Sequence, residues 1–155
     1  METKELNEGD KAPAFNLLAS NNEKVSLADL KGKWVALYFY PKDDTPGCTK
    51  EACNFRDGLS QFKEKNAVIL GVSPDDVASH QKFSKKLDLP FLLLADTDQK
   101  LCEAYGVWKM KSMYGKEYLG VERSTFLINP EGKIAKIWRK VQVDGHDAQV
   151  LAAIG

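Results

Sequence analysis

The sequence contains few residues of the kinds that build metal centres or disulfide scaffolds. It has three cysteines and only two histidines, His80 and His146, and it has no Cys-x-x-Cys pair. Ligand spacing of the zinc type is therefore missing. A small, odd number of thiols also argues against a secreted fold held together by disulfides. We expect no bound metal ion.

An excess of one charge and a long apolar run are missing as well. Twenty-two basic and 22 acidic side chains cancel, so the composition does not favour binding to nucleic acid or to an anionic membrane. The longest apolar run, residues 34–40, is far too short to cross a bilayer. Residues 1–6 are too polar for a secretory signal. We therefore expect a protein of the reducing cytoplasm that does not insert into a membrane.

Apolar segments of strand length alternate with amphipathic helical segments through the first two-thirds of the chain. Strands are expected at 34–40, 67–73, 91–95, 124–129 and 133–138, and helices at 46–65, 75–87, 98–105 and 147–154. This order predicts an α/β protein with a thioredoxin-like fold, in which helices flank a mixed central sheet. No linker composition divides residues 1–155, so a single domain is expected.

Two further segments complete this prediction. Residues 14–18 and 24–27 flank a polar turn and are expected to form an N-terminal β-hairpin extension, followed by a short helical stretch that ends near Gly32. Residues 108–118 are polar and irregular, which predicts a loop.

Cys48 stands where a reactive thiol is expected. It follows the apolar run 34–40 and a turn-rich stretch, and Pro46 suits the first turn of the helix that comes next. Unpaired backbone N–H groups and the positive end of the helix dipole favour an anion at this position. A thiolate is such an anion, and it is the nucleophilic form of cysteine.

The helix start alone is too weak to ionise this thiol. A thiol with the ordinary pKa near ~8.5 must gain roughly 2.7 kcal/mol to become mostly thiolate at neutral pH. A helix terminus typically contributes ~0.3–1 kcal/mol, and up to ~2 when partly buried. Thr45 and Arg123 are candidates for the missing hydrogen bonds and charge. An N-cap for Thr45 and a solvated surface charge for Arg123 are equally open.

Two segments resemble the peroxiredoxin family. Pro41-x-x-x-Thr45-x-x-Cys48 resembles its active-site motif, and residues 122–128, Glu-Arg-Ser-Thr-Phe-Leu-Ile, resemble the strand that carries its catalytic arginine. A second thiol, Cys53, five residues after Cys48, is similar to the bacterioferritin comigratory protein, or peroxiredoxin Q, subfamily. The resemblance extends from residue 9 to the C-terminal helix.

This resemblance implies a thioredoxin-dependent thiol peroxidase with two active cysteines in one chain, acting in antioxidant defence. Cys48 would attack hydrogen peroxide or an organic hydroperoxide and become a sulfenic acid. Thr45 would hydrogen-bond the peroxide and the sulfur, and Pro41 would wall the pocket. Arg123 would hold the thiolate and stabilise the leaving oxygen. Cys53 would then form an intramolecular disulfide with Cys48.

The resemblance also implies partners. Thioredoxin or a similar dithiol would reduce the disulfide, and no haem, metal or flavin would be needed. The subfamily implies a monomer, although other members of the family dimerise.

Helix geometry makes the pairing of Cys48 with Cys53 demanding. Five residues of ideal helix correspond to ~7.5 Å of rise and ~500° of rotation, which separates the two Cα atoms by roughly 8.6 Å. A disulfide rarely spans a Cα separation above ~7 Å. We therefore expect the first turns of this helix to unwind in each catalytic cycle.

The remaining polar and thiol residues are expected to have structural roles. Cys102 should pack in a core, and helix 75–87 has no cysteine that could resolve the sulfenic acid instead. His80 should be exposed, and His146 should begin the last helix. Asp43 and Asp44 should form a turn. Glu51 should be an exposed charge, with a hydrogen bond near Arg123 as the alternative.

Two other functions are open at this point. A thiol–disulfide oxidoreductase acting on proteins normally uses Cys-x-x-Cys, which this chain lacks. A redox-sensing or chaperone-like binding protein would oxidise at Cys48 but turn over slowly.

Overall fold

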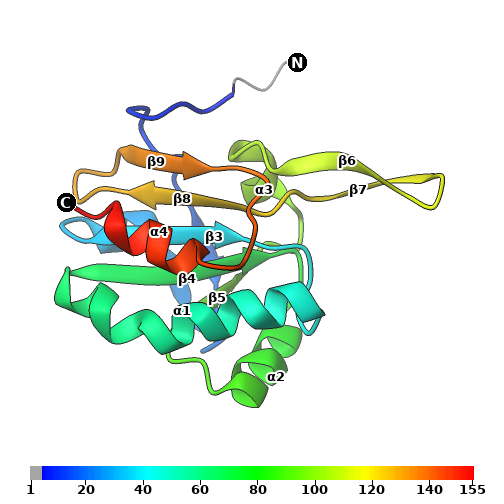
Figure 1. Ribbon diagram of the computed structural model, residues 1–155, viewed down its shortest axis with the longest axis horizontal. Helices are drawn as coiled ribbons and strands as arrows, with labels where there is room; N and C mark the ends of the chain where they lie inside the picture. The colour runs from blue at the N-terminus through cyan, green and yellow to red at the C-terminus, as the bar shows by residue number, and fades with distance from the viewer. Residues whose placement is uncertain (1–4) are drawn as a thin grey trace.

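A five-stranded mixed sheet forms the centre of the computed structural model, which describes residues 5–155 (Figure 1). The strand order is β5-β4-β3-β8-β9. The strands are β3 (Trp34–Phe39), β4 (Ala67–Ser73), β5 (Leu92–Ala95), β8 (Ser124–Ile128) and β9 (Ile134–Trp138). β3, β4 and β5 are parallel, and β8 and β9 run antiparallel to their neighbours. The predicted mixed α/β sheet flanked by helices is confirmed.

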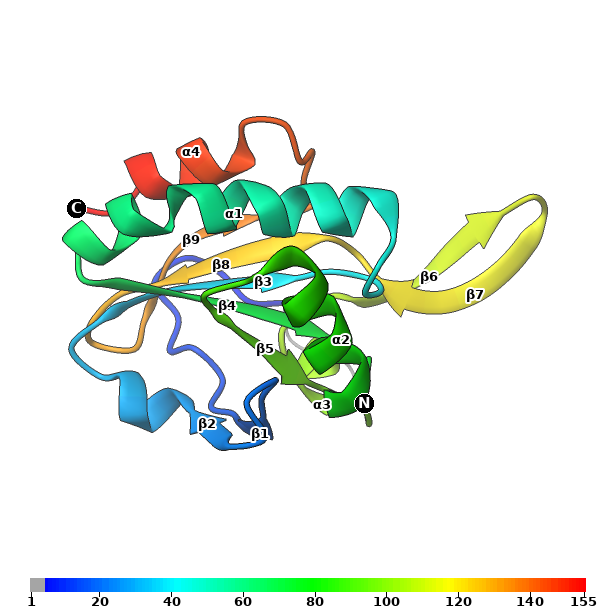
Figure 2. The same cartoon turned by 90° about the horizontal axis from the view of Figure 1, so that it is seen from below.

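Helices cover both faces of this sheet (Figure 2). The long helix α1 (Pro46–Glu64) and α4 (His146–Ala152) pack on one face, together with Phe83 of α2 (Val77–Leu87). On the other face lie α3 (Lys100–Ala104) and the N-terminal hairpin. Side chains of β3 alternate between the two cores, so every position from Val35 to Phe39 is buried. This explains the apolar run without alternation.

The N-terminal hairpin was also predicted correctly. β1 (Asn16–Leu18) pairs antiparallel with β2 (Lys24–Ser26), and a short 3-10 helix, η1 (Leu27–Leu30), follows. The hydroxyl of Ser26 accepts a hydrogen bond from the backbone N–H of Asp29, which caps this turn. The absence of a secretory signal concerns residues 1–6, of which 1–4 lie outside the described range.

The loop predicted for residues 108–118 is wrong. β6 (Trp108–Met113) and β7 (Lys116–Val121) pair antiparallel and extend away from the body of the protein (Figure 2). Tyr114 and Gly115, at φ of 53° and 77°, form the two-residue turn that such hairpins favour. Most side chains of the hairpin are exposed, so its sequence is largely polar, and only residues 108–111 alternate between apolar and polar side chains.

Over residues 5–155, no helix has the combination of length and apolar composition that crossing a membrane requires.

Candidate active site

Cys48 lies in the first turn of α1, at the carboxyl end of β3, and only 2% of its surface is exposed. Pro46 begins the helix, as the sequence predicts. Thr45 occupies the N-cap position but makes no side-chain capping hydrogen bond to the helix. The dipole end and the first backbone N–H groups of α1 are therefore available to an anion at Cys48.

Arg123 reaches this thiol from the neighbouring strand. It immediately precedes β8, whose Ser124 pairs with Phe39 at the end of β3. Its Nη2 donates a hydrogen bond to Cys48 Sγ at 3.2 Å, although 75 residues separate the two in sequence. The sheet thus delivers a fixed positive charge to the sulfur, which helix geometry alone could not supply.

Glu51 holds the other arm of this guanidinium. Nη1 of Arg123 donates to Glu51 Oε1 at 2.6 Å. The carboxylate is 1% exposed, so the expectation of a solvated charge is wrong and the alternative hydrogen bond near Arg123 is present. Burial raises the pKa of Glu51 to about 7, although the charge of Arg123 lowers it. Its second oxygen, Oε2, is buried and has no hydrogen-bond partner among the described residues.

The charge of Arg123 is secured by both acceptors. Burial by itself lowers the pKa of Arg123, but the Coulombic attraction of Glu51 and of Cys48 outweighs burial and raises that pKa above its ordinary value. The guanidinium therefore stays charged and has two arms fixed in different directions.

Gly47 leaves room for this arrangement. A Cβ atom at position 47 would lie 3.2 Å from Arg123 Nη2. Glycine is therefore favoured here by the close approach of a side chain rather than by backbone conformation.

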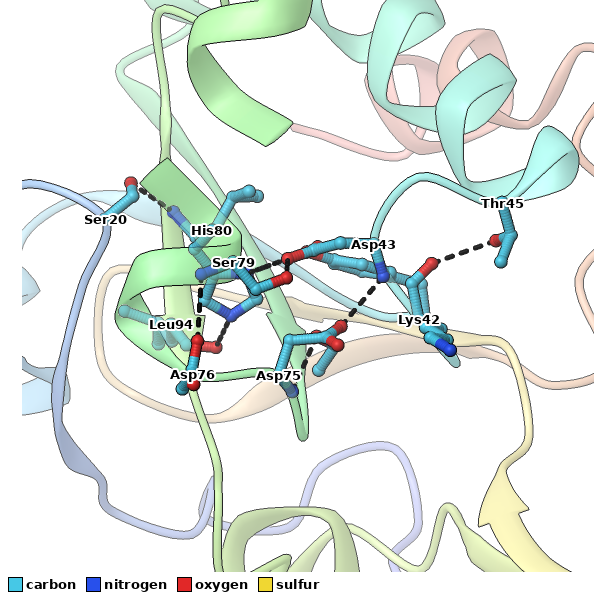
Figure 3. Close-up of polar contacts among 12 residues, drawn as sticks. Ser20, Lys42, Asp43, Thr45, Asp75, Asp76, Ser79, His80 and Leu94 are labelled. Atoms are coloured by element: carbon cyan, nitrogen blue, oxygen red, sulfur yellow. Dashed lines mark hydrogen bonds and ion pairs between the residues drawn. The ribbon is translucent and has the colours of Figure 1, made fainter. Parts of the chain in front are cut away.

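The loop between β3 and α1 carries the other two motif residues. Pro41 and Thr45 are both partly buried. The Thr45 hydroxyl donates to the backbone carbonyl of Lys42 at 2.9 Å (Figure 3). Its oxygen lone pairs can still accept a hydrogen bond from a hydroperoxide.

Cys53 is partly buried on the same helix, and both it and Cys48 are free thiols. Because α1 is continuous from Pro46 to Glu64, the helical separation of the two cysteines applies to this state. One helix thus carries both the candidate nucleophile and a second thiol. The two residues are too far apart to form a disulfide while the helix is intact.

Cys102 belongs to a core, as predicted. It is completely buried on α3, and its backbone N–H donates to Asp96 Oδ2 at 2.8 Å. Burial and then the Asp96 carboxylate raise the pKa of Cys102 far above the usual range for a thiol. This cysteine remains protonated and unreactive.

Two histidines are more buried than their surroundings in sequence suggest. His146 begins α4 as predicted, and its Nε2 lies 2.7 Å from the hydroxyl of Thr125 on β8. Burial lowers the pKa of His146. His80 was expected to be exposed, but it is completely buried. The spacing of His80 and Phe83 on one face of α2 was the signal for this.

Asp43 is also not a simple turn former. It is 6% exposed and accepts a hydrogen bond from the hydroxyl of Tyr40 at 2.5 Å. It also accepts one from the hydroxyl of Ser79 at 2.8 Å (Figure 3). Asp43, Asp75 and His80 place possible metal-ligand atoms within 4.8 Å of one another. All three side chains are already engaged in hydrogen bonds with protein groups.

Lys111 was missed because its segment was predicted to be a loop. Burial and then the charge of Arg123 lower the pKa of Lys111, while Cys48 and Glu122 raise it. The β6–β7 hairpin therefore places a second cation within electrostatic reach of the site.

The sequence and the fold both match known proteins. The AhpC/TSA family profile matches residues 8–137. Peroxiredoxin Bcp of Bacillus subtilis is 56% identical over 146 residues, which cover 94% of this chain and 93% of the relative.

Two solved structures show the same likeness. The bacterioferritin comigratory protein of Xanthomonas campestris, described for its alkyl peroxide reduction activity, has a TM-score of 0.86 at 48% identity, covering 90% of this chain and 89% of its own. PrxQ of Xylella fastidiosa has a TM-score of 0.91 at 42% identity, covering 96% and 95%.

Proposed function

The chain belongs to the AhpC/TSA family of peroxiredoxins, and we propose that Cys48 is its peroxidatic cysteine, working with Thr45, Pro41 and Arg123. The enzyme is a thiol peroxidase. The hydrogen bond from Arg123 to Cys48 Sγ at the start of α1 is the observation that carries the assignment of the site. It places a fixed cation on the sulfur that begins the helix, which favours the thiolate.

In the first step the Cys48 thiolate attacks the terminal oxygen of a hydroperoxide. The O–O bond breaks, an S–O bond forms, and the departing alkoxide takes up a proton to leave as an alcohol, or as water when the substrate is hydrogen peroxide. Sulfur is oxidised to sulfenic acid and the peroxide is reduced. Arg123 offsets charge on the departing oxygen, and Thr45 accepts a hydrogen bond from the substrate. Pro41 restricts water in the pocket.

In the second step Cys53 resolves the sulfenic acid. The Cys53 sulfur attacks the Cys48 sulfur, a disulfide forms, and hydroxide leaves with the thiol proton as water. Because α1 carries both residues, its first turns must unwind for the sulfurs to meet. Unwinding also exposes the disulfide to an incoming thiolate.

A dithiol donor completes the cycle. Its thiolate attacks the disulfide and forms a mixed disulfide with one cysteine while the other leaves as a thiol. The second thiol of the donor then attacks the donor sulfur of the mixed disulfide, which leaves Cys48 and Cys53 reduced and the donor oxidised. Thioredoxin is the donor proposed here, and hydrogen peroxide and alkyl hydroperoxides are the proposed substrates. The alkyl peroxide reduction described for the Xanthomonas protein supports the second substrate class. We further propose a monomer of one domain, acting in the cytoplasm without haem, metal or flavin.

Consumption of NADPH in the presence of thioredoxin, thioredoxin reductase and peroxide tests this function. The wild-type chain should sustain many turnovers, and Cys48→Ser should abolish them. Cys53→Ser should react once with peroxide and then stop, because no intramolecular disulfide can form. Full activity in Cys48→Ser would overturn the site assignment.

The same experiment separates the other two functions. A thiol–disulfide oxidoreductase would reduce insulin disulfides without peroxide. A redox sensor would oxidise once and then turn over slowly even with thioredoxin present.

A further inference from the structure

The loop that carries Pro41 and Thr45 is fastened to the body of the protein through Asp43. This segment, residues 41–45, is called the peroxidatic loop below. The Asp43 carboxylate is buried; Oδ1 accepts a hydrogen bond from the hydroxyl of Tyr40. Its Oδ2 faces Ser79 and His80 of α2 (Figure 3). A buried carboxylate must be fully hydrogen-bonded to avoid a large desolvation cost. The position of the loop is therefore tied to the partners of Asp43.

His80 is the Asp43 partner that reaches deepest into the protein. Its Nδ1 lies 2.7 Å from Asp43 Oδ2, and its Nε2 lies 2.9 Å from the backbone carbonyl of Leu94. Both ring nitrogens thus face acceptors, whereas a neutral imidazole has only one N–H. The contact between His80 and Asp43 is therefore a buried polar pair. This pair joins the peroxidatic loop, α2 and β5 across 37 residues of sequence.

A second set of bonds fixes the backbone of the same loop. The Asp43 N–H donates to Asp75 Oδ2 at 2.8 Å, and that oxygen also accepts from the hydroxyl of Ser73 at the end of β4, at 2.6 Å. On the surface, Lys86 pairs with Asp44 at 2.7 Å, but both side chains are more than half exposed. Exposed pairs of this kind contribute little. The buried bonds of Asp43 therefore hold the loop more strongly than this exposed pair does.

The peroxidatic loop leads directly into the segment that must move. Thr45 is the N-cap of α1, and Cys48 follows three residues later. A loop that is held in place keeps the hydroxyl of Thr45 and the first turn of α1 where a peroxide can react. Release of the loop favours the unwound helix, in which Cys53 can reach Cys48. The two half-reactions therefore need opposite states of the same segment.

We propose that His80 is a positioning residue of the peroxide-reducing step: through Asp43 it holds the peroxidatic loop in the reactive arrangement and opposes the unwinding of α1 that resolution requires. This inference rests on the proposed function of Cys48 and Cys53 and goes beyond it. His80 itself touches neither the sulfur nor the peroxide. A residue serving only as core filling would not need a buried polar pair, because apolar side chains of similar volume pack with less desolvation cost.

Three substitutions at position 80 distinguish the contribution of the Nδ1 contact from that of the Nε2 contact. His80→Asn places an amide N–H near the position of Nδ1 and keeps the bond to Asp43. His80→Gln places its amide N–H near the position of Nε2 and keeps the bond to the Leu94 carbonyl. Asp43 then lacks the hydrogen bond from position 80. His80→Leu removes both. Lys86→Gln is the matched control, because it breaks the exposed pair between the same helix and the same loop.

Each half-reaction is measured by itself. Rapid mixing of the reduced protein with hydrogen peroxide, in the Cys53→Ser background, gives the rate constant for forming the sulfenic acid. In chains that retain Cys53, the later phase gives the rate of disulfide formation, and urea titration reports whether each variant is folded.

We expect His80→Gln and His80→Leu to slow the peroxide step by roughly ten- to hundredfold, the range that corresponds to one lost hydrogen bond to a charged group. Their disulfide step should be as fast as in the wild type or faster. His80→Asn and Lys86→Gln should keep the peroxide step within about threefold, a change of less than ~1 kcal/mol.

Several outcomes would overturn the proposal. One is an unchanged peroxide step in folded His80→Gln. Another is a folded His80→Asn that is as slow as His80→Gln, and a third is equal slowing of both half-reactions. Should Lys86→Gln slow the peroxide step as much, a general loosening of α2 would explain the result instead. Failure of the proposed function is recognised separately, by activity that survives in Cys48→Ser.

Discussion

At the scale of single residues, the proposed site is built around a guanidinium with both arms occupied. Arg123 donates one arm to Cys48 and the other to Glu51, and Gly47 leaves the space in which it lies. Cys48 was singled out by its position at a helix start, whereas for Arg123 the residues alone left a solvated surface charge equally open and the family resemblance decided. The burial of Glu51 could not be predicted, because an acidic side chain on a helix is normally solvated.

Substitution of Arg123 by lysine should impair the site although the charge remains. A lysine has a single ammonium group and cannot hold the sulfur and the Glu51 carboxylate with a planar fork. We expect the rate of peroxide reduction, and of Cys48 alkylation by iodoacetamide at neutral pH, to fall by about 10- to 100-fold, because a charge-assisted hydrogen bond is worth ~1.5–3 kcal/mol. Alkylation of Arg123→Lys at the wild-type rate would contradict the role of the guanidinium.

Gly47→Ala tests the space above the helix start. The added methyl group would approach Arg123 Nη2 to 3.2 Å and push the guanidinium away from Cys48. Peroxide reduction should fall roughly three- to tenfold, which corresponds to ~0.6–1.4 kcal/mol of lost interaction. Thermal stability should not fall, because alanine is the better helix former. A parallel loss of activity and melting temperature would point to general misfolding.

At the scale of elements, α1 has to serve two states in the proposed mechanism, one wound and one partly unwound. Its buried face, formed by Phe55, Leu59 and Phe62, anchors the second half of the helix to the sheet. The first half carries the reacting thiols. This division was predictable from the apolar spacing on the helix, whereas the β6–β7 hairpin was not, because most of its side chains face solvent on both sides.

Hydrogen exchange should locate the unwinding. In the reduced protein, amides 50–57 should be protected by helical hydrogen bonds. After one equivalent of peroxide forms the Cys48–Cys53 disulfide, protection should fall by at least about tenfold within 50–54 and persist at 59–64, where the helix is anchored. Mass-spectrometric exchange on both states measures this. Unchanged protection in a fully oxidised sample would exclude the unwinding step.

At the scale of the whole molecule, two buried titratable groups make stability depend on pH in opposite directions. Burial lowers the pKa of His146 and raises the pKa of Glu51 to about 7. His146 ties α4 to β8, and Glu51 ties α1 to Arg123. The global fold could be predicted from the order of strands and helices. The hydrogen bonds of His146 and Glu51 could not be predicted, because they join segments that are far apart in sequence.

His146 should weaken the fold as the pH falls. Its pKa is lower in the folded than in the unfolded chain, so below about pH 6.5 the unfolded state binds more protons. The contribution of this group is complete above that pH and is lost as the pH falls through the folded pKa. Urea unfolding of the wild type and of His146→Gln, repeated at several values between about pH 5 and 7.5, gives the unfolding free energy as a function of pH. This free energy should change less steeply with pH in the variant. Equal slopes would contradict the buried neutral imidazole.

Glu51 should act in the other direction. Its folded pKa of about 7 lies above the ordinary value of 4.5, so the folded state holds the extra proton between these values. The contribution of this group to stability is therefore lost as the pH rises toward 7. We expect the unfolding free energy of Glu51→Gln to rise relative to the wild type as the pH increases through this window. A difference in unfolding free energy between the two proteins that stays constant with pH would rule out a raised pKa of Glu51.

The link between Arg123 and Cys48 spans 75 positions in the chain and forms only where β8 lies beside β3. During synthesis on a ribosome, residue 48 emerges long before residue 123, and strand β8 must be available before the sheet can close around the pair. Until then the nascent thiol has no guanidinium beside it and behaves as an ordinary cysteine. In the proposed mechanism, the enhanced reactivity of Cys48 toward peroxide therefore arises only when the fold is complete.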